Sequence, residues 1–339
     1  MEFDKFPKYS IIEKMSDNST TSVFKAIRIS DELPVVLKVF DTKRMNENMT
    51  YAHYFEEDGV VLPVPKEFLF LGKVQHIDGC VKMLDIINDS SNGKWILVLE
   101  DLEENGYINL AKELTNSGKS ISMSAVSWII KEVIDVLLDI HSVGILHCDL
   151  KPDNIFVDFK SGKVKLIDFN LSQELEQNHI GVIPGCTPDY APPEVLIQRR
   201  PWTEAGEVWS LGCTAFVLLC RRFPFENPYL AAFSSPVYPR CALETSENLS
   251  PGTNTNVLFS MSKRPAFRGF GQNALDINDD IRLSPKAKDF LLLCLTRQPD
   301  LRPTLGTLLQ HAFLNRTGQD SLKSSGSASF THRSAIMVK

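Results

Sequence analysis

Two short segments carry polar side chains whose chemistry suits the transfer of a phosphoryl group. They are residues 147–154, which read His-Cys-Asp-Leu-Lys-Pro-Asp-Asn, and residues 166–170, which read Leu-Ile-Asp-Phe-Asn. Asp149 offers a carboxylate to a substrate hydroxyl, and Lys151 can hold a transferring phosphate. Asn154 and Asp168 offer the hard oxygen ligands that Mg²⁺ prefers. Phosphoryl transfer needs an oriented hydroxyl, a clamped triphosphate and cations on the developing charge, and these residues provide a group for each need.

Hydrophobic periodicity predicts the elements that position these groups. Apolar residues recur at three- and four-residue steps through residues 121–141, which predicts a core helix leading toward Asp149. His141, at the end of this helix, is expected to be packed rather than chemically active. Residues 154–157 and 163–167 read as a small hairpin flanking Asp168. The other predicted strands are 9–15, 22–29, 34–40, 81–88 and 95–100, and the other predicted helices are 64–74, 207–220, 284–295 and 303–311.

The two polar segments resemble the catalytic loop and the magnesium-binding motif of eukaryotic protein kinases. Lysine at position 151 is typical of serine/threonine specificity. The resemblance extends over residues 9–313 and implies an α+β, two-lobed protein kinase fold. A small five-stranded β lobe with one main helix would comprise residues 9–101, and a larger helical lobe would comprise residues 102–313.

The resemblance also implies roles for individual residues toward ATP and Mg²⁺. Lys38 would grip the α- and β-phosphates and Glu67 would be its partner, although a strand lysine and a helix glutamate are more commonly solvated. The hinge that receives adenine would include Glu100 and Leu102. Asp149 would orient the substrate hydroxyl and Lys151 would stabilise the γ-phosphate. The magnesium ligands would be Asn154 and Asp168.

The predicted phosphate-binding turn departs from the family pattern. Counting back from Val23, the three glycine positions of the family motif are occupied by Ser16, Asn18 and Thr21. Glycine allows backbone amides to approach phosphates closely, so weaker ATP binding is expected here.

The predicted activation segment runs from Asp168 to Glu194. By resemblance, Thr187 would support the catalytic aspartate, and Glu194 would form a structural ion pair with Arg302. Cys148 replaces an arginine that commonly pairs with a phosphorylated activation segment, so this chain should not depend on such a switch. A disulfide between Cys148 and Cys186 that blocks the site is an alternative to two unrelated thiols, which is the more usual state of free cysteine.

Several stretches look like the PIM group of serine/threonine kinases. They are V-P-x-E at 64–67, G-K-V-K-L-I-D-F at 162–169, P-P-E at 192–194 and V-W-S-L-G at 208–212. In the PIM group, as in this chain, the last of these stretches lacks the aspartate that kinases usually have in this helix. This likeness implies basic protein substrates, with Asp153 contacting a substrate arginine. The acidic residues Glu100, Asp101, Glu103 and Glu104 either contribute to this recognition or form a solvated edge. The alternative to an active kinase is a pseudokinase that acts as a binding or scaffold module.

Composition and cysteine spacing bear on the partners and the cellular location of the protein. The net charge of −6 over 339 residues argues against nucleic acid as the main partner. Seven cysteines without a C-x-x-C pair indicate reduced thiols, and hence the cytosol or nucleus. We expect no membrane association, because the most apolar run, 208–220, is too short to cross a bilayer. We also expect a monomer. The remaining predicted segments are a leader at 1–8, a polar insertion at 41–62, a larger insertion at 226–280 and a disordered tail at 314–339.

Overall fold

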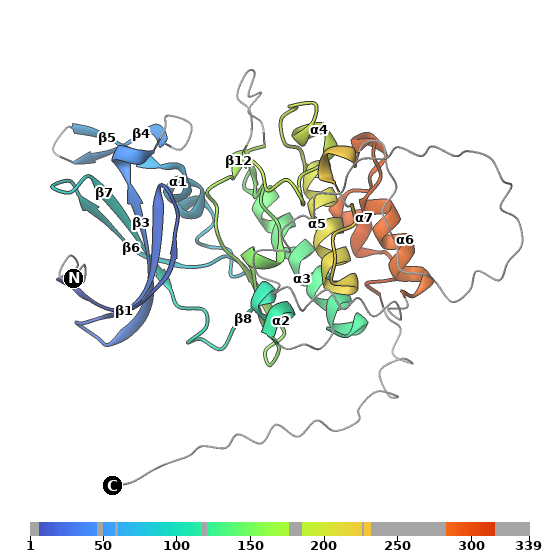
Figure 1. Ribbon diagram of the computed structural model, residues 1–339, viewed down its shortest axis with the longest axis horizontal. Helices are drawn as coiled ribbons and strands as arrows, with labels where there is room; N and C mark the ends of the chain where they lie inside the picture. Colours follow the sequence, from blue (N-terminus) through green and yellow to red (C-terminus); the bar gives the residue numbers. More distant parts are fainter. Residues whose placement is uncertain are drawn as a thin grey trace, which may run out of the picture.

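The computed structural model describes residues 7–45, 50–57, 60–116, 121–175, 185–225, 227–231 and 283–315. The predicted leader, the insertion at 226–280 and the tail at 314–339 lie mostly outside these residues. Figure 1 shows a β-sheet at one end of the molecule and a group of helices at the other. The predicted α+β architecture, with a small five-stranded β lobe and a larger helical lobe, is confirmed.

The small lobe is built on a five-stranded antiparallel sheet with the order β1-β2-β3-β7-β6. All five predicted strands are present: β1 (Tyr9–Asp17), β2 (Thr21–Arg28), β3 (Leu33–Asp41), β6 (Met83–Asp89) and β7 (Lys94–Glu100). Strand β3 lies in the centre and alternates buried residues with partly exposed ones. Its register places Lys38 opposite Val23 of β2 and Leu97 of β7, so the lysine projects from the middle of the sheet.

The predicted polar insertion at 41–62 contains two strands that were not predicted from the sequence. Strands β4 (Thr50–Glu57) and β5 (Val60–Pro65) form an antiparallel hairpin before helix α1 (Lys66–Lys73). The sequence contained a signal for it, because an Asp-Gly dipeptide at 58–59 separates two stretches rich in β-branched and aromatic residues. Helix α1 begins later than predicted, because β5 continues to Pro65, which is extended and caps the helix.

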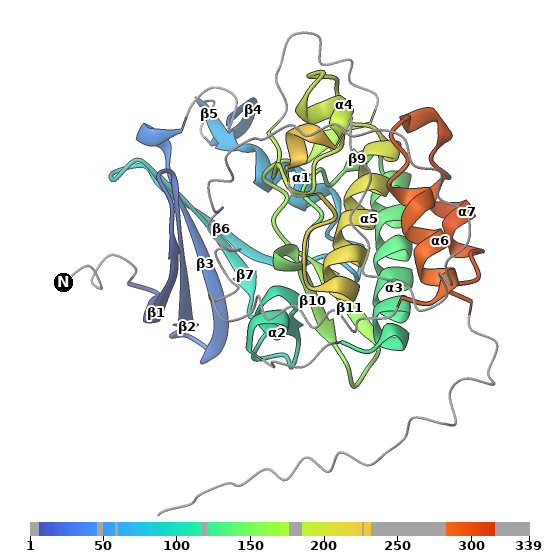
Figure 2. The same cartoon turned by 45° about the vertical axis from the view of Figure 1, so that its right-hand side comes forward.

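The large lobe packs helices against one another around α3 (Met123–Ser142) and α5 (Glu204–Cys220), which lie side by side in Figure 2. The hydroxyl of Ser122 accepts the backbone N–H of Ala125 at the start of α3, and Thr203 caps α5 in the same way. Because of this cap, α5 begins at Glu204, before the predicted start at residue 207. The remaining helices are α2 (Leu110–Asn116), α4 (Pro193–Leu196), α6 (Pro285–Cys294) and α7 (Leu305–Leu309), the last shorter than predicted.

Short strands bring the polar segments to the junction of the lobes. Strands β10 (Ile155–Asp158) and β11 (Lys163–Leu166) form the predicted hairpin, and β8 (Ile108–Asn109) joins it. The strand β9 (Ile145–Leu146), just before the catalytic segment, pairs with β12 (Gln173–Glu174), just after Asp168. One hydrophobic core cluster includes Phe68 of α1, Phe169 and residues of α3 and α5, so the packing is continuous between the lobes.

No helix among the described residues is both long enough and apolar enough to span a membrane.

Candidate active site

Lys38 lies between two carboxylates that come from different parts of the fold. Its Nζ is 2.8 Å from Oε1 of Glu67 on α1 and 2.7 Å from Oδ1 of Asp168. The second oxygen of Glu67 is 2.6 Å from the same nitrogen as an ion pair. Glu67 is 2% exposed, so this is a buried charge cluster rather than a solvated pair. The contact between Lys38 and Glu67 is the one predicted from the sequence.

The electrostatics of this cluster follow from two carboxylates sharing one ammonium group. Burial raises the pKa of Glu67 to about 7, with Lys38 opposing the shift. Burial also disfavours the Asp168 carboxylate, but Lys38 outweighs it, and the Asp168 pKa lies below its usual value. Burial opposes the charge on Lys38, yet Asp168 and Glu67 together raise its pKa. Near neutral pH, Asp168 is therefore more fully ionised than Glu67.

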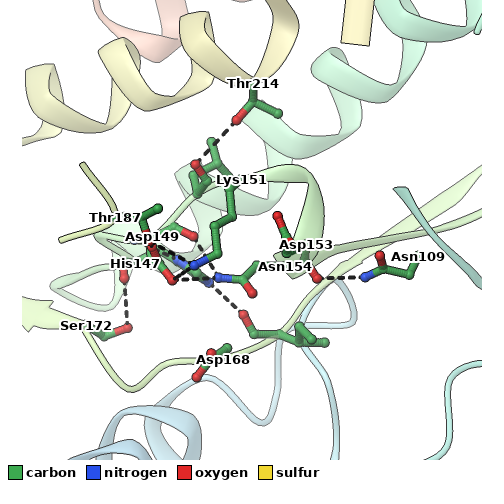
Figure 3. A network of polar contacts seen from close by, with 12 residues as sticks. Asn109, His147, Asp149, Lys151, Asp153, Asn154, Asp168, Ser172, Thr187 and Thr214 are labelled. Atoms are coloured by element: carbon green, nitrogen blue, oxygen red, sulfur yellow. Dashed lines mark hydrogen bonds and ion pairs between the residues drawn. The ribbon is translucent and has the colours of Figure 1, made fainter. Parts of the chain in front are cut away.

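Asp149, Lys151 and Asn154 form a second network, together with Thr187 from the activation segment (Figure 3). The Lys151 ammonium lies 2.6 Å from Oδ2 of Asp149 and 2.9 Å from Oγ1 of Thr187. Thr187 donates to Oδ1 of Asp149 at 2.5 Å, and the Asn154 amide donates to Oδ2 at 2.9 Å. Each oxygen of the Asp149 carboxylate thus has a donor from a fixed position, which orients the group.

Backbone and ring contacts join the two polar segments. His147 donates from Nε2 to the Ile167 carbonyl at 3.0 Å, and the Ile167 N–H donates to the Asn154 carbonyl at 3.1 Å. The ring of Phe169 is fully buried and lies 4.9 Å from that of His147. With Phe169 directed inward, Asp168 lies beside Lys38.

The backbone after Asp168 does not require the glycine that Asn170 replaces. Asp168 itself has a positive φ of 65°, whereas Asn170 has no positive φ. Asparagine therefore replaces glycine after Asp-Phe without a left-handed backbone in this conformation.

Asn154 and Asp168 fit the requirements of a Mg²⁺ site by the chemistry of their donors. Asn154 uses its amide nitrogen to bind the main-chain and side-chain oxygens of Asp149, which leaves its hard carbonyl oxygen as the ligand atom. Asp168 contributes a carboxylate whose pKa is lowered, so it is ionised near neutral pH. Mg²⁺ commonly takes one or two protein ligands plus phosphates and water, so a pair of such residues suffices.

The residues at the three glycine positions lie in the hairpin of β1 and β2. Ser16 pairs with Val23, and the turn is closed by a 2.8 Å hydrogen bond from the Asn18 N–H to the Thr21 carbonyl. Asp17, between them, accepts hydrogen bonds from the Lys14 ammonium and the Ser22 hydroxyl, each at 2.6 Å. The hairpin is therefore closed by its own side chains and carries a carboxylate at its tip.

The hinge residues are committed to contacts within the protein. Glu100 accepts the backbone N–H of Lys82 at 2.8 Å and also binds the Lys165 ammonium. Leu102 is buried, and its carbonyl accepts the Tyr107 N–H. The adenine-binding role predicted for Glu100 and Leu102 would involve backbone atoms, and it stays a prediction.

The rest of the acidic run is also engaged. Asp101 is 4% exposed and accepts the backbone N–H groups of Glu103 and Glu104. Glu103 binds two lysines, Lys25 of β2 at 2.8 Å and Lys112 of α2. The interpretation of this run as either a substrate-reading patch or a solvated edge therefore needs correction, because three of its four carboxylates have internal partners.

A buried network of polar contacts next to Asp149 was not predicted from the sequence. Glu207 of α5 is fully buried and accepts the Cys148 N–H at 2.8 Å. Its other oxygen binds Nε2 of His141, and Nδ1 of His141 lies 3.5 Å from Glu204. Cys148 has a positive φ of 63°, so Glu207 holds an unusual backbone conformation next to Asp149. The sequence signal that could have revealed this network was Glu207, a single glutamate at the predicted start of a long apolar helix.

The contact of His141 with Glu207 predicts a pH-dependent contribution to stability. Burial lowers the pKa of His141, but Glu207 outweighs it and the pKa lies above 6.5; the pKa of Glu207 lies below 4.5 despite its burial. A raised histidine pKa stabilises the fold at pH values below about 6.5 and ceases to do so as pH rises through the folded-state pKa. The depressed Glu207 pKa stabilises above about 4.5 and is lost as pH falls further.

We therefore expect His141→Gln to lower the free energy of unfolding by about 1.5–3 kcal/mol between pH 5 and 6, and by less at pH 9. Urea denaturation at several pH values measures the difference between parent and variant. A difference that is constant from pH 5 to pH 9 would contradict the charged pair.

The end of the activation segment is anchored as predicted from the resemblance. Arg302 forms two hydrogen bonds with Glu194, of 2.6 and 2.9 Å, and both side chains are buried. The guanidinium also donates to three backbone carbonyls and lies 5.0 Å from the ring centroid of Trp209. This pair fixes α4 to the helical lobe.

Cys148 and Cys186 are both free thiols in the structure. Burial raises the pKa of each, and Glu207 and Asp149 raise that of Cys148 further. Both contact the same small apolar cluster. Thiols held in the protonated form react slowly with oxidants, which favours packing over a redox role.

Comparison with known proteins agrees with this geometry. The family model described as "Protein kinase domain" matches residues 9–314. The chain is 25% identical over 321 residues to "Serine/threonine-protein kinase pim-2" of Danio rerio, covering 93% of this chain and 87% of the relative. It is 30% identical over 264 residues to "Calcium/calmodulin-dependent protein kinase type 1B" of Rattus norvegicus, covering 74% and 66% respectively. "Serine/threonine-protein kinase 4 homolog A" of Dictyostelium discoideum is 26% identical over 324 residues, covering 93% and 57%.

Proposed function

This chain belongs to the protein kinase family, and from that premise we propose that it transfers the γ-phosphate of ATP to serine or threonine residues of proteins. The observation that carries the proposal is the Asp149 carboxylate, which is oriented by Lys151, Thr187 and Asn154. A fold retained only for binding has no physical need for this arrangement beside a complete Lys38–Glu67–Asp168 cluster.

In the proposed mechanism, the residues position the reactants rather than form covalent bonds. Mg²⁺-ATP, when bound, would supply the phosphoryl group and positive charge that offsets the charge of the phosphates. Lys38 would hold the α- and β-phosphates, while Asp168 and Asn154 would hold the metal ion. Asp149 accepts a hydrogen bond from the substrate hydroxyl and orients it, and Lys151 stabilises negative charge on the transferring group.

We further propose that the substrates are basic. Asp153 is exposed beside the catalytic segment, and among the described residues its carboxylate has no ion-pair partner. Its backbone is fixed, because the Asn109 amide donates to the Asp153 carbonyl at 2.6 Å. An exposed carboxylate on a fixed backbone, four residues after Asp149, suits a substrate arginine.

The glycine-free hairpin supports weakened ATP binding and also supports the second candidate, a pseudokinase. Side chains at Ser16, Asn18 and Thr21 limit how closely backbone amides approach phosphates. Loss of a few such hydrogen bonds costs about 1–3 kcal/mol, which weakens binding but does not by itself abolish turnover.

The test is transfer of labelled γ-phosphate to an arginine-rich serine peptide with Mg²⁺-ATP, by the parent and by Asp168→Asn. We expect transfer by the parent and none above background by the variant. Nucleotide-induced thermal shifts are recorded on the same samples. A thermal shift without transfer would favour a nucleotide-binding scaffold, and neither signal would favour a scaffold for protein partners alone.

The same assay tests the hairpin. Ser16→Gly/Asn18→Gly/Thr21→Gly is expected to lower the KM for ATP while leaving the KM for the peptide unchanged. An unchanged KM for ATP would show that the missing glycines do not limit nucleotide binding.

A further inference from the structure

Each hydroxyl side chain of the activation segment is either buried or hydrogen-bonded to Asp149 and Lys151. Between Asp168 and Glu194 the sequence has three hydroxyl side chains, Ser172, Thr187 and Tyr190. Ser172 is 3% exposed and donates to the His147 carbonyl, and Tyr190 is also 3% exposed. Thr187 is bonded to both Asp149 and Lys151. A phosphate on any of the three would disrupt the structure around Asp149.

The side chain that would bind such a phosphate is also replaced. Cys148, directly before the catalytic aspartate, is 1% exposed and packs in an apolar cluster with Leu146 and Trp202. It offers no positive charge. The contacts that order the start of the activation segment against α1 must therefore come from the protein's own side chains and not from a phosphate.

An ion pair joins α1 to the start of the activation segment. The Lys73 ammonium, in the last turn of α1, lies 2.6 Å from Oε1 of Glu174 in β12. Strand β12 is itself fixed, because Glu174 pairs with Ile145 of β9, and the Leu175 N–H donates to the Gly144 carbonyl at 2.8 Å. Glu174 thus presents a carboxylate from the framework that leads into the catalytic segment.

Helix α1 is consequently held at both ends. Glu67 in its first turn binds Lys38, and Lys73, about 9 Å further along the axis, binds Glu174. We propose that Lys73 and Glu174 are positioning residues, whose ion pair fixes α1 so that Glu67 meets Lys38 without phosphorylation. The role in catalysis rests on the proposed function, whereas the effect on α1 does not.

The experiment measures amide hydrogen exchange of α1 together with the KM for ATP. Glu174→Gln keeps the shape of the side chain and removes its charge. Because the side chains are 41% and 28% exposed, we expect α1 amides to exchange about two- to fivefold faster, and the KM for ATP to rise similarly. The KM for the peptide should not change. Lys73→Gln should reproduce both effects, and Lys73→Arg should retain the behaviour of the parent.

Two comparisons separate this role from general destabilisation. In Lys73→Gln/Glu174→Gln, the effects on α1 should not exceed those of either single variant, because the two residues act as one pair. Asp31→Asn removes a local ion pair of similar exposure, with Arg28, and should change neither measurement.

Unchanged exchange of α1 in Glu174→Gln would overturn the proposal, as would additive effects in the double variant. If the parent transfers no phosphate, the exchange data still decide whether the pair holds α1. Failure of the kinase proposal is therefore distinguishable from failure of this one.

Discussion

Asp149→Asn is expected to lower kcat for peptide phosphorylation by about 10²–10⁴-fold, the range typical of losing a general base. The variant keeps an oxygen that can accept from Thr187, but it loses the charge that binds Lys151 and the substrate hydroxyl. Initial rates of γ-phosphate transfer measure the effect, and nucleotide-induced thermal shifts should match those of the parent because Lys38 and Asp168 are unchanged.

Asp78→Asn is the matched control, since the Asp78 side chain is 93% exposed. It should leave kcat unchanged. A kcat for Asp149→Asn within tenfold of the parent would mean that another group orients the hydroxyl.

Arg302→Met is expected to lower the free energy of unfolding by about 3–5 kcal/mol, because it leaves the buried carboxylate of Glu194 without its partner. The methionine preserves much of the packing against Trp209, so most of the loss is electrostatic. Urea denaturation followed by tryptophan fluorescence measures it. Adding Glu194→Gln should recover part of the loss, since the unpaired charge is then removed.

The control for this variant is Arg28→Met, which removes an ion pair with partly exposed side chains and should lower the free energy of unfolding far less than Arg302→Met. Similar losses for the two arginine variants would indicate that the Glu194 pair contributes no more than a surface pair.

Contacts within recognised motifs could be predicted from the sequence. The contacts of Lys38 with Glu67, of Thr187 with Asp149 and of Glu194 with Arg302 are present in the structure. Each joins residues far apart in the chain, and spacing alone could not have paired them. The resemblance supplied the pairing, and the residue types made it chemically sensible.

Features without a motif were harder to predict. The β4–β5 hairpin was not predicted because the segment was interpreted only as a polar insertion, although the sequence contains an Asp-Gly dipeptide between its two strands. The contact of His141 with Glu207 depends on two helices meeting, which periodicity does not reveal. The partners of Glu100, Asp101 and Glu103 include side chains from three other segments, β2, α2 and β11, and a run of charges does not reveal these contacts.

The two lysines bound to Glu103 come from opposite sides of the hinge, Lys25 from β2 and Lys112 from α2. A rotation that separates β2 from α2 would lengthen at least one of these contacts. The side chains of both contacts are partly exposed, so dissolved ions weaken them. Higher ionic strength should therefore allow the two lobes to rotate apart more freely and, under the proposed function, to release nucleotide faster.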